Sequence, residues 1–228
     1  MAPEVRDYAA FFRGFIRNPL RVASLVPSST CLGKRIAEIA NVAQARSVVE
    51  FGPGTGATTR QILRAMRSEA TLLSIERDSE FAKLVAAHRD SRLTVHVGNA
   101  GDVAQAIAYY GLQRPQAIIS GIPFSTLAPD DAAAIIRAIE CMLAPNGVFV
   151  AYQLSAAVTE VAAPVFGRPE TTWELRNLPP LRIFRWCVPA RTSVAAAAGL
   201  VSDAPSARCA TRRVQLADGS ESSGSRAR

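Results

Sequence analysis

The chain has 228 residues, of which 49% are hydrophobic and 20% charged, which predicts one soluble globular domain with extensions. No apolar run reaches the roughly 18–20 residues that a membrane-spanning helix needs, and the scattered cysteines (Cys31, Cys141, Cys187 and Cys209) argue against a zinc site and for a reducing cytoplasm. The net charge is +7, with +3 in residues 1–40 and +3 in residues 189–228. Basic ends of this kind suit an anionic partner, either a membrane or a nucleic acid.

The N-terminal segment, residues 1–24, is predicted to form an amphipathic helix that ends at Pro19. On a helix, the spacing of the aromatic residues places them on one face, and most of the arginines lie outside this face. The face comprises Tyr8, Phe11, Phe12, Phe15 and Ile16, and the flanking cations include Arg13 and Arg17. Such a helix either lies in a membrane interface or caps the domain as a lid, and both roles are compatible. Residues 26–30 then supply a turn and an N-cap for a helix over 31–40.

A glycine-rich turn follows the β-branched run that starts at Ser47. The run ends in Glu50, and the chain then reads Phe51, Gly52, Pro53, Gly54, Thr55 and Gly56 before a helix-like segment over 57–66. Glycines at a strand-to-helix turn allow a tight bend and let a ligand approach the backbone N–H groups. A second acid, Glu76, closes the next apolar run, at a spacing that suits a carboxylate holding a ribose diol. This pattern predicts a nucleoside cofactor.

The residues around the glycines distinguish between cofactors. A dinucleotide fingerprint would read G-x-G-x-x-G and cradle a pyrophosphate, whereas Glu50 would repel phosphates and attract an ammonium or sulfonium group. The segment resembles motif I of the class I S-adenosylmethionine-dependent methyltransferases. That resemblance implies that Glu50 and residues 51–56 hold the amino-acid end of S-adenosylmethionine, that Glu76, with Arg77 beside it, holds its ribose, and that Asn99, followed by Ala100, meets its adenine.

Short apolar runs alternate with helical segments from Val48 to Gln153, which predicts a mostly parallel sheet covered by helices on both faces. Period-two patterns at 171–176 and 181–186 predict a closing antiparallel hairpin. We therefore expect an α/β, Rossmann-like, seven-stranded domain over residues 25–188. Its strands are predicted at 47–51, 71–76, 93–97, 116–120 and 147–154, and its later helices at 129–144 and 155–166. Residues 189–228 are predicted to be a disordered low-complexity tail.

The acceptor site is expected where strand 116–120 ends in Ser120, Gly121, Ile122, Pro123 and Phe124, since ligands bind at the carboxyl ends of such strands. The segment resembles the Asn- or Asp-x-Pro-aromatic motif of adenine amino-methyltransferases. It has Ser120 and Gly121 in place of the amide that grips the base, and Ser offers one donor and a shorter reach. Tyr8 and Tyr152 are further candidate acceptor-site hydroxyls, with core packing as the alternative for each. No general base is evident.

The S-G-x-P motif, the N-terminal Phe-Phe-Arg-Gly-Phe-Ile-Arg-Asn-Pro and the Trp-Glu-Leu-Arg-Asn hairpin resemble bacterial phospholipid N-methyltransferases. The resemblance implies stepwise methylation of phosphatidylethanolamine towards phosphatidylcholine by a cytoplasmic protein on the inner face of the cell membrane, without a nucleic-acid partner. Two alternatives remain open. One is an adenine-N6 methyltransferase acting on ribosomal RNA, and the other is a cofactor-binding protein without catalysis.

Overall fold

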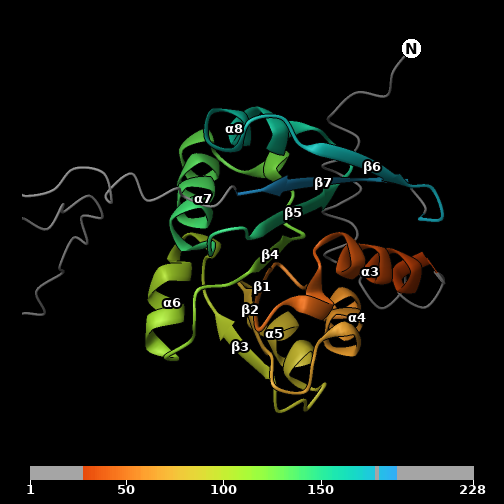
Figure 1. Ribbon diagram of the computed structural model, residues 1–228, viewed down its shortest axis with the longest axis vertical. Helices are drawn as coiled ribbons and strands as arrows, with labels where there is room; N and C mark the ends of the chain where they lie inside the picture. Colours follow the sequence, from red (N-terminus) through yellow and green to blue (C-terminus); the bar gives the residue numbers. More distant parts are fainter. Residues whose placement is uncertain (1–27, 178–179, 189–228) are drawn as a thin grey trace, which may run out of the picture. The chain divides into compact units, whose positions relative to one another are not determined.

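The computed structural model describes residues 28–177 and 180–188, and these residues form a seven-stranded sheet flanked by helices (Figure 1). The strand order is β3-β2-β1-β4-β5-β7-β6. The first five strands in chain order pair in parallel, and β7 pairs antiparallel with both β5 and β6. The strands are β1 (Ser47–Phe51), β2 (Thr71–Glu76), β3 (Leu93–Val97), β4 (Ala117–Ser120), β5 (Val148–Gln153), β6 (Glu170–Glu174) and β7 (Leu181–Cys187).

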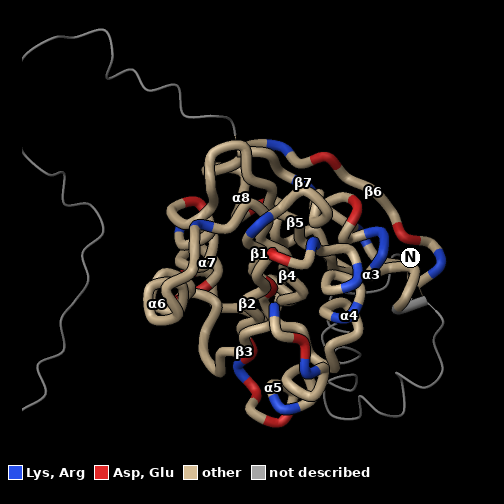
Figure 2. The backbone as a smooth tube through the Cα atoms, turned by 60° about the horizontal axis from the view of Figure 1, so that its bottom comes forward, with Lys and Arg blue, Asp and Glu red and all other residues tan. Residues whose placement is uncertain are grey.

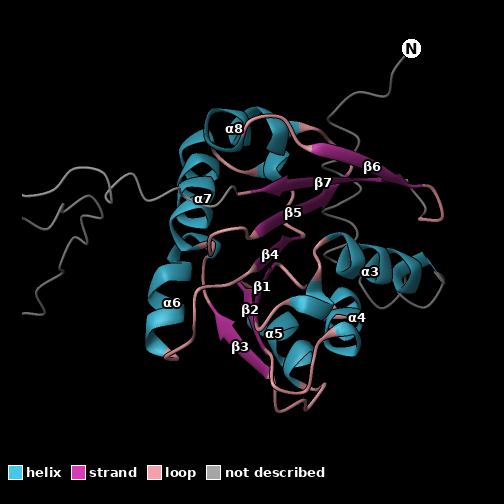
Figure 3. Ribbon diagram, viewed as in Figure 1, coloured by secondary structure: helices cyan, strands magenta, loops and turns pink. Residues whose placement is uncertain are grey.

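Helices cover both faces of this sheet (Figure 3). One face carries α3 (Ser28–Ile39), α4 (Ala57–Ala65) and α5 (Ser79–Ala86), and the other carries α6 (Val103–Tyr109), α7 (Pro129–Met142) and α8 (Ala157–Phe166). Short 3-10 turns are η1 (Val42–Gln44), η2 (Ala100–Asp102) and η3 (Phe124–Thr126).

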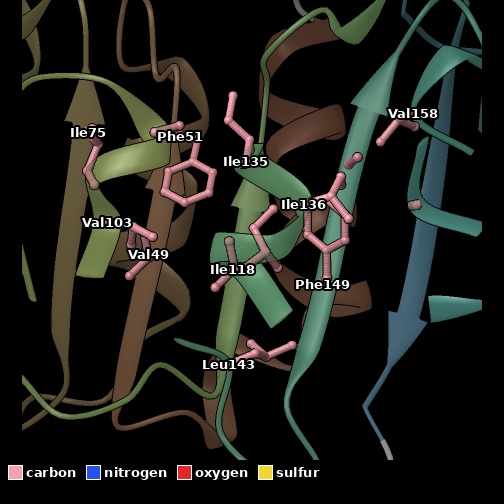
Figure 4. Close-up of a cluster of buried hydrophobic side chains, with 14 of the residues drawn as sticks. Val49, Phe51, Ile75, Val103, Ile118, Ile135, Ile136, Leu143, Phe149 and Val158 are labelled. Carbon is pink, nitrogen blue, oxygen red and sulfur yellow. The ribbon is translucent and has the colours of Figure 1, made fainter. Parts of the chain in front are cut away.

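Successive residues of the central strands enter opposite hydrophobic clusters, because side chains alternate between the faces of a strand. Val48 packs in the cluster under α3 and α4, whereas Val49 packs in the cluster under α6 and α7. Figure 4 shows the second cluster, in which the labelled side chains of sheet and helices meet. These side chains are Val49, Phe51, Ile75, Val103, Ile118, Ile135, Ile136, Leu143, Phe149 and Val158.

The hairpin of β6 and β7 is fixed to both layers. Trp186 stacks on Phe149 with ring centroids 5.0 Å apart, and its indole N–H donates to the Gly167 carbonyl at 3.1 Å. On the opposite face, Arg185 donates from Nε to the carbonyl of Ile39 at 3.1 Å and pairs with Glu170 at 2.9 Å. The hairpin therefore has a defined position beside β5.

The predicted seven-stranded fold is confirmed, and the predicted strands at 47–51, 71–76 and 93–97 match the observed ones. The strands predicted at 116–120 and 147–154 are shorter in the structure, since β4 begins at Ala117 and β5 runs from Val148 to Gln153. Several boundaries were wrong. Helix α3 already begins at Ser28 rather than after a cap at residues 26–30. Helix α7 ends at Met142 rather than at 144, α8 begins at Ala157 rather than at 155, and β6 spans Glu170–Glu174 rather than 171–176. The predicted N-terminal helix and the tail lie outside the described residues, so their assignments stay predictions.

Lys and Arg alternate with Asp and Glu along the described backbone instead of gathering on one element (Figure 2). Of the helices that the structure describes, none is long and apolar enough to cross a membrane. Within residues 28–177 and 180–188, His, Cys, Asp and Glu side chains form no group of three or more that could hold a metal ion.

Candidate active site

The turn from β1 to α4 runs through three glycines with positive φ angles, 63° at Gly52, 55° at Gly54 and 79° at Gly56. Such angles strain any residue that has a Cβ. At Gly54 the position of a Cβ would have no atom within 4 Å, whereas at Gly52 it would lie 3.2 Å from Ile122 Cγ1. The loop thus packs closely against the end of β4 and leaves open space beside Gly54.

Glu50, at the end of β1, is fully buried. Its Oε2 accepts hydrogen bonds from Thr59 Oγ1 at 2.7 Å and Ser74 Oγ at 3.1 Å, while its Oε1 has no partner among the described residues. Burial raises the pKa of the Glu50 carboxyl to about 7, although the two hydroxyls act to lower it. An ionisable group whose pKa lies this far from its usual value is typical of a functional site.

Glu76, at the end of the neighbouring strand β2, is also buried, but each of its two carboxylate oxygens accepts a hydrogen bond. Its Oε2 accepts from Gly54 N at 3.1 Å, and its Oε1 accepts from Asp78 N at 3.0 Å. Asp78 in turn caps α5 by accepting from Glu80 N at 2.8 Å. Glu76 therefore ties the glycine loop to the start of α5, and both predicted acids lie at the same edge of the sheet.

The structure places the other predicted cofactor residues along the same edge. Asn99 follows β3, and its Oδ1 accepts from Gly101 N at 3.0 Å, so the side chain caps η2. Ala100 is buried behind it, and Arg77 is exposed beside Glu76. The contact between Asn99 and adenine stays a prediction. Because Oδ1 accepts from Gly101 N, the amide nitrogen of Asn99 would be the atom that makes this contact.

The predicted acceptor segment leaves β4 beside the glycine loop. Gly121 N donates to the Phe51 carbonyl at 2.9 Å, and Ser120 Oγ accepts from Ile122 N at 3.3 Å. Ser120 is fully buried. After Pro123, the backbone N–H of Phe124 donates to Gln153 Oε1 at 3.1 Å. The segment is therefore held to β1 on one side and to β5 on the other.

Tyr152 lies where β5 meets the glycine loop. Its hydroxyl donates to Thr58 Oγ1 at 3.3 Å, and a Cβ at Gly121 would lie 2.5 Å from that hydroxyl. Burial, with a smaller effect of the negative charge on Glu50, raises the pKa of Tyr152. The hydroxyl remains protonated and packs between the glycine loop and the acceptor segment. Tyr8, the other candidate, lies outside the described residues.

Several residues of the site were missed from sequence. Thr59 and Ser74 bind Glu50, Gln153 binds the acceptor segment, and His88 Nε2 lies 3.1 Å from the Gly56 carbonyl. A polar residue inside the otherwise apolar run Leu72–Ile75 was a usable signal for Ser74, because buried polar groups need a partner. His88 lies just after α5, which ends at Ala86.

The residues present fit S-adenosylmethionine. Glu50 offers a buried oxygen without a partner, Gly54 offers open space beside a bare backbone, and Glu76 is an acceptor on the adjacent strand. A buried carboxylate oxygen without a partner is costly, and the cationic amino acid and sulfonium of this cofactor would compensate for it.

The comparisons with known proteins give two kinds of relative. A family model described as "Ribosomal RNA adenine dimethylase" matches residues 28–124. An "Ornithine lipid N-methyltransferase" from Singulisphaera acidiphila is 27% identical over 179 residues, which cover 77% of this chain and 93% of that protein. A "Ribosomal RNA small subunit methyltransferase A" from Caulobacter vibrioides is 36% identical over 95 residues, but the match covers only 40% of this chain and 34% of that protein.

Solved structures give the fold. The N-methyltransferase NodS from Bradyrhizobium japonicum, in complex with S-adenosyl-L-homocysteine, superposes with a TM-score of 0.63 at 14% identity, over 80% of this chain and 98% of that one. TrmN from Thermus thermophilus superposes with a TM-score of 0.60 at 13% identity, over 71% of this chain and 52% of that one. Together these matches show that the chain has the fold of class I S-adenosylmethionine-dependent methyltransferases, and the acids and glycines of its site fit S-adenosylmethionine as the cofactor.

Proposed function

We propose that the protein transfers a methyl group from S-adenosylmethionine to the primary amine of a membrane lipid. One relative that matches along nearly its whole length, 93% of it, is an ornithine lipid N-methyltransferase. The matches to ribosomal RNA methyltransferases, by contrast, span only 30–44% of those proteins, for example 34% of the protein from Caulobacter vibrioides. A match over both chains supports a shared acceptor class more strongly than a match confined to the cofactor half.

The observation that carries the proposal is the state of Ser120. Its side chain is fully buried, and its hydroxyl oxygen accepts the N–H of Ile122 two residues on. A side-chain amide at this position would reach a planar base with an oxygen and a nitrogen on separate atoms, whereas Ser120 offers one buried hydroxyl of shorter reach, whose oxygen already accepts from Ile122 N. A small flexible amine does not need the amide.

For the acceptor we propose phosphatidylethanolamine, methylated towards phosphatidylcholine, with an ornithine headgroup as the near relative. Both headgroups offer a primary amine close to an anionic group. When bound, S-adenosylmethionine supplies a methyl carbon on positively charged sulfur, so that the lone pair of a neutral amine forms the C–N bond while the C–S bond breaks and its electrons neutralise the sulfur. The methylated ammonium then releases its proton to water before a further methylation.

The contribution of the protein is chiefly positioning. Glu50 and the glycine loop would orient one reactant, and the segment Ser120–Phe124, held by Phe51 and Gln153, would orient the other. Alignment of two reactants in this way provides much of the acceleration in such displacements.

The proposal is tested by transfer of labelled methyl groups into vesicles. We expect label in vesicles that contain phosphatidylethanolamine or ornithine lipid, and none in vesicles made only of phosphatidylcholine, which has no free amine. An absence of label in every aminolipid, from protein that binds S-adenosylmethionine, would contradict the proposal.

Membrane association is proposed to depend on residues 1–24, which lie outside the described residues. The double variant Phe11→Glu, Phe15→Glu should lose binding to anionic vesicles in a cosedimentation assay, because it places two charges on the predicted aromatic face. The matched control Glu4→Gln, Asp7→Asn removes two charges and should retain binding. Unchanged sedimentation of the double glutamate variant would show that another surface meets the lipid.

A further inference from the structure

A shallow cavity of about 560 Å³, largely open to solvent, lies between α8 and the hairpin of β6 and β7, outside the cofactor site described above. Its apolar wall includes Ala163, Pro169 and Phe184, and its polar wall includes Arg168, Arg182 and Glu160. Two cations and one carboxylate leave the cavity with a net positive charge. This combination suits a ligand that is part hydrocarbon and part anion.

Arg182 is the unusual member of this cavity. Its guanidinium carbon lies 4.6 Å from the ring centroid of Trp173, over the face of a half-exposed indole. Its Nε is buried and has no hydrogen-bond partner, and among the described residues no carboxylate pairs with it. The next arginine on the strand, Arg185, has both a carbonyl and a carboxylate partner. A buried cationic N–H without an acceptor is costly. An anion that accepts a hydrogen bond from Arg182 would remove this cost.

Arg182, which lines the cavity, is connected to the acceptor segment through Gln153. Arg182 is the register partner of Gln153 across the antiparallel strands β7 and β5, and directly opposed residues point to the same face of a sheet. Gln153 accepts from Phe124 N through Oε1, while its buried Nε2 has no partner among the described residues. Two unsatisfied donors therefore occur on neighbouring strands, next to the segment that is proposed to receive the amine.

We propose that Arg182, on the wall of the cavity, binds the anionic group of the aminolipid acceptor, a phosphate or a carboxylate, and that Gln153 links Arg182 to the acceptor segment. The indole ring of Trp173 packs against the Arg182 guanidinium and keeps it in place, since an indole face attracts a cation. The apolar wall of the cavity receives the hydrocarbon that adjoins the anion, and the amine of the same headgroup reaches the segment Ser120–Phe124. This inference rests on the proposed methylation of a lipid amine and adds which part of the lipid is recognised.

The test compares Arg182→Gln with the wild type on three dispersed acceptors. Phosphatidylethanolamine carries a phosphate, ornithine lipid carries a carboxylate, and a long-chain alkylamine carries no anion. We expect KM to rise about tenfold for an anion-bearing acceptor, because a hydrogen bond to a charged group is lost, with kcat and the affinity for S-adenosylmethionine unchanged. For the alkylamine, KM should stay the same.

Two further variants separate recognition from structure. Arg182→Lys keeps the charge and should recover part of the affinity, while Arg137→Gln removes an exposed charge on α7 and should change nothing. A larger effect on phosphatidylethanolamine assigns the site to a phosphate, and a larger effect on ornithine lipid assigns it to a carboxylate. An unchanged KM, or an equal rise with the alkylamine, would overturn the inference alone. Failure of the wild type to methylate any of the three would overturn the proposed function itself.

Discussion

The Glu50→Gln variant is expected to be more stable than the wild type at neutral and alkaline pH. Burial holds the pKa of Glu50 at about 7, above the ordinary glutamate value of 4.5, so near neutral pH the folded protein binds a proton that the unfolded chain has released. The stability that this proton provides is present in full below about pH 4.5 and is lost as the pH rises to about 7. The loss is at most about 3 kcal/mol, and a glutamine, which has no charge to bury, avoids it.

Urea unfolding between about pH 5 and pH 8 checks this expectation. The free energy of unfolding of the wild type should fall over this range relative to that of Glu50→Gln. Glu140→Gln, on α7, is the matched control and should keep the slope of the wild type. Parallel curves for the wild type and Glu50→Gln would mean that Glu50 titrates normally.

The same residue should make cofactor binding depend on pH. Ionised Glu50 attracts a cationic ligand, so the affinity of the wild type for S-adenosylmethionine should increase as the pH rises through about 7. Calorimetric titration should show this increase in the wild type and only weaker, pH-independent binding in Glu50→Gln. Equal affinity in the two proteins would contradict a contact between Glu50 and the cofactor.

The second large effect is expected at Glu76. Glu76→Ala should weaken binding of S-adenosylmethionine by about 100-fold, as the loss of charge-assisted hydrogen bonds to a ribose would. The variant also removes the acceptor for the N–H groups of Gly54 and Asp78, which loosens the glycine loop that is proposed to hold the cofactor. The measurement is again calorimetry, on protein shown to be folded by its circular dichroism.

Glu69→Ala is the matched control for this variant, because it removes an exposed carboxylate close to the start of β2. Its affinity for S-adenosylmethionine should equal that of the wild type. If Glu76→Ala bound the cofactor within about twofold of the wild type, Glu76 would serve only the fold, since even one lost charged hydrogen bond exceeds that factor.

The elements that sequence predicted well are those with local signals. Val48 and Val49 lead into a glycine turn, and Pro129 begins α7 at its first position, where its missing N–H costs nothing. The start of α3 was misplaced because Ser and Thr are good N-caps, yet here Ser28, Ser29 and Thr30 continue into the helix. Local preference could not reveal that choice.

Some residues of the candidate site could likewise be predicted from local sequence, and others could not. Glu50 and Glu76 were found because each closes an apolar run, and the geometry brings both to one edge. Gln153 and Arg182 were not found, because their importance comes from contacts between distant segments, such as the bond from Phe124 N. The raised pKa of Glu50 likewise depends on burial under α4 and β2, which no short window of sequence contains.

The most direct test is a competition in one reaction that contains the protein, labelled S-adenosylmethionine, vesicles with phosphatidylethanolamine and ornithine lipid, and under-methylated ribosomal RNA. A lipid amine as the acceptor predicts label in the lipid fraction and none in the RNA. Label in the RNA alone would contradict the proposed function and assign the protein to the adenine methyltransferases that its family model describes.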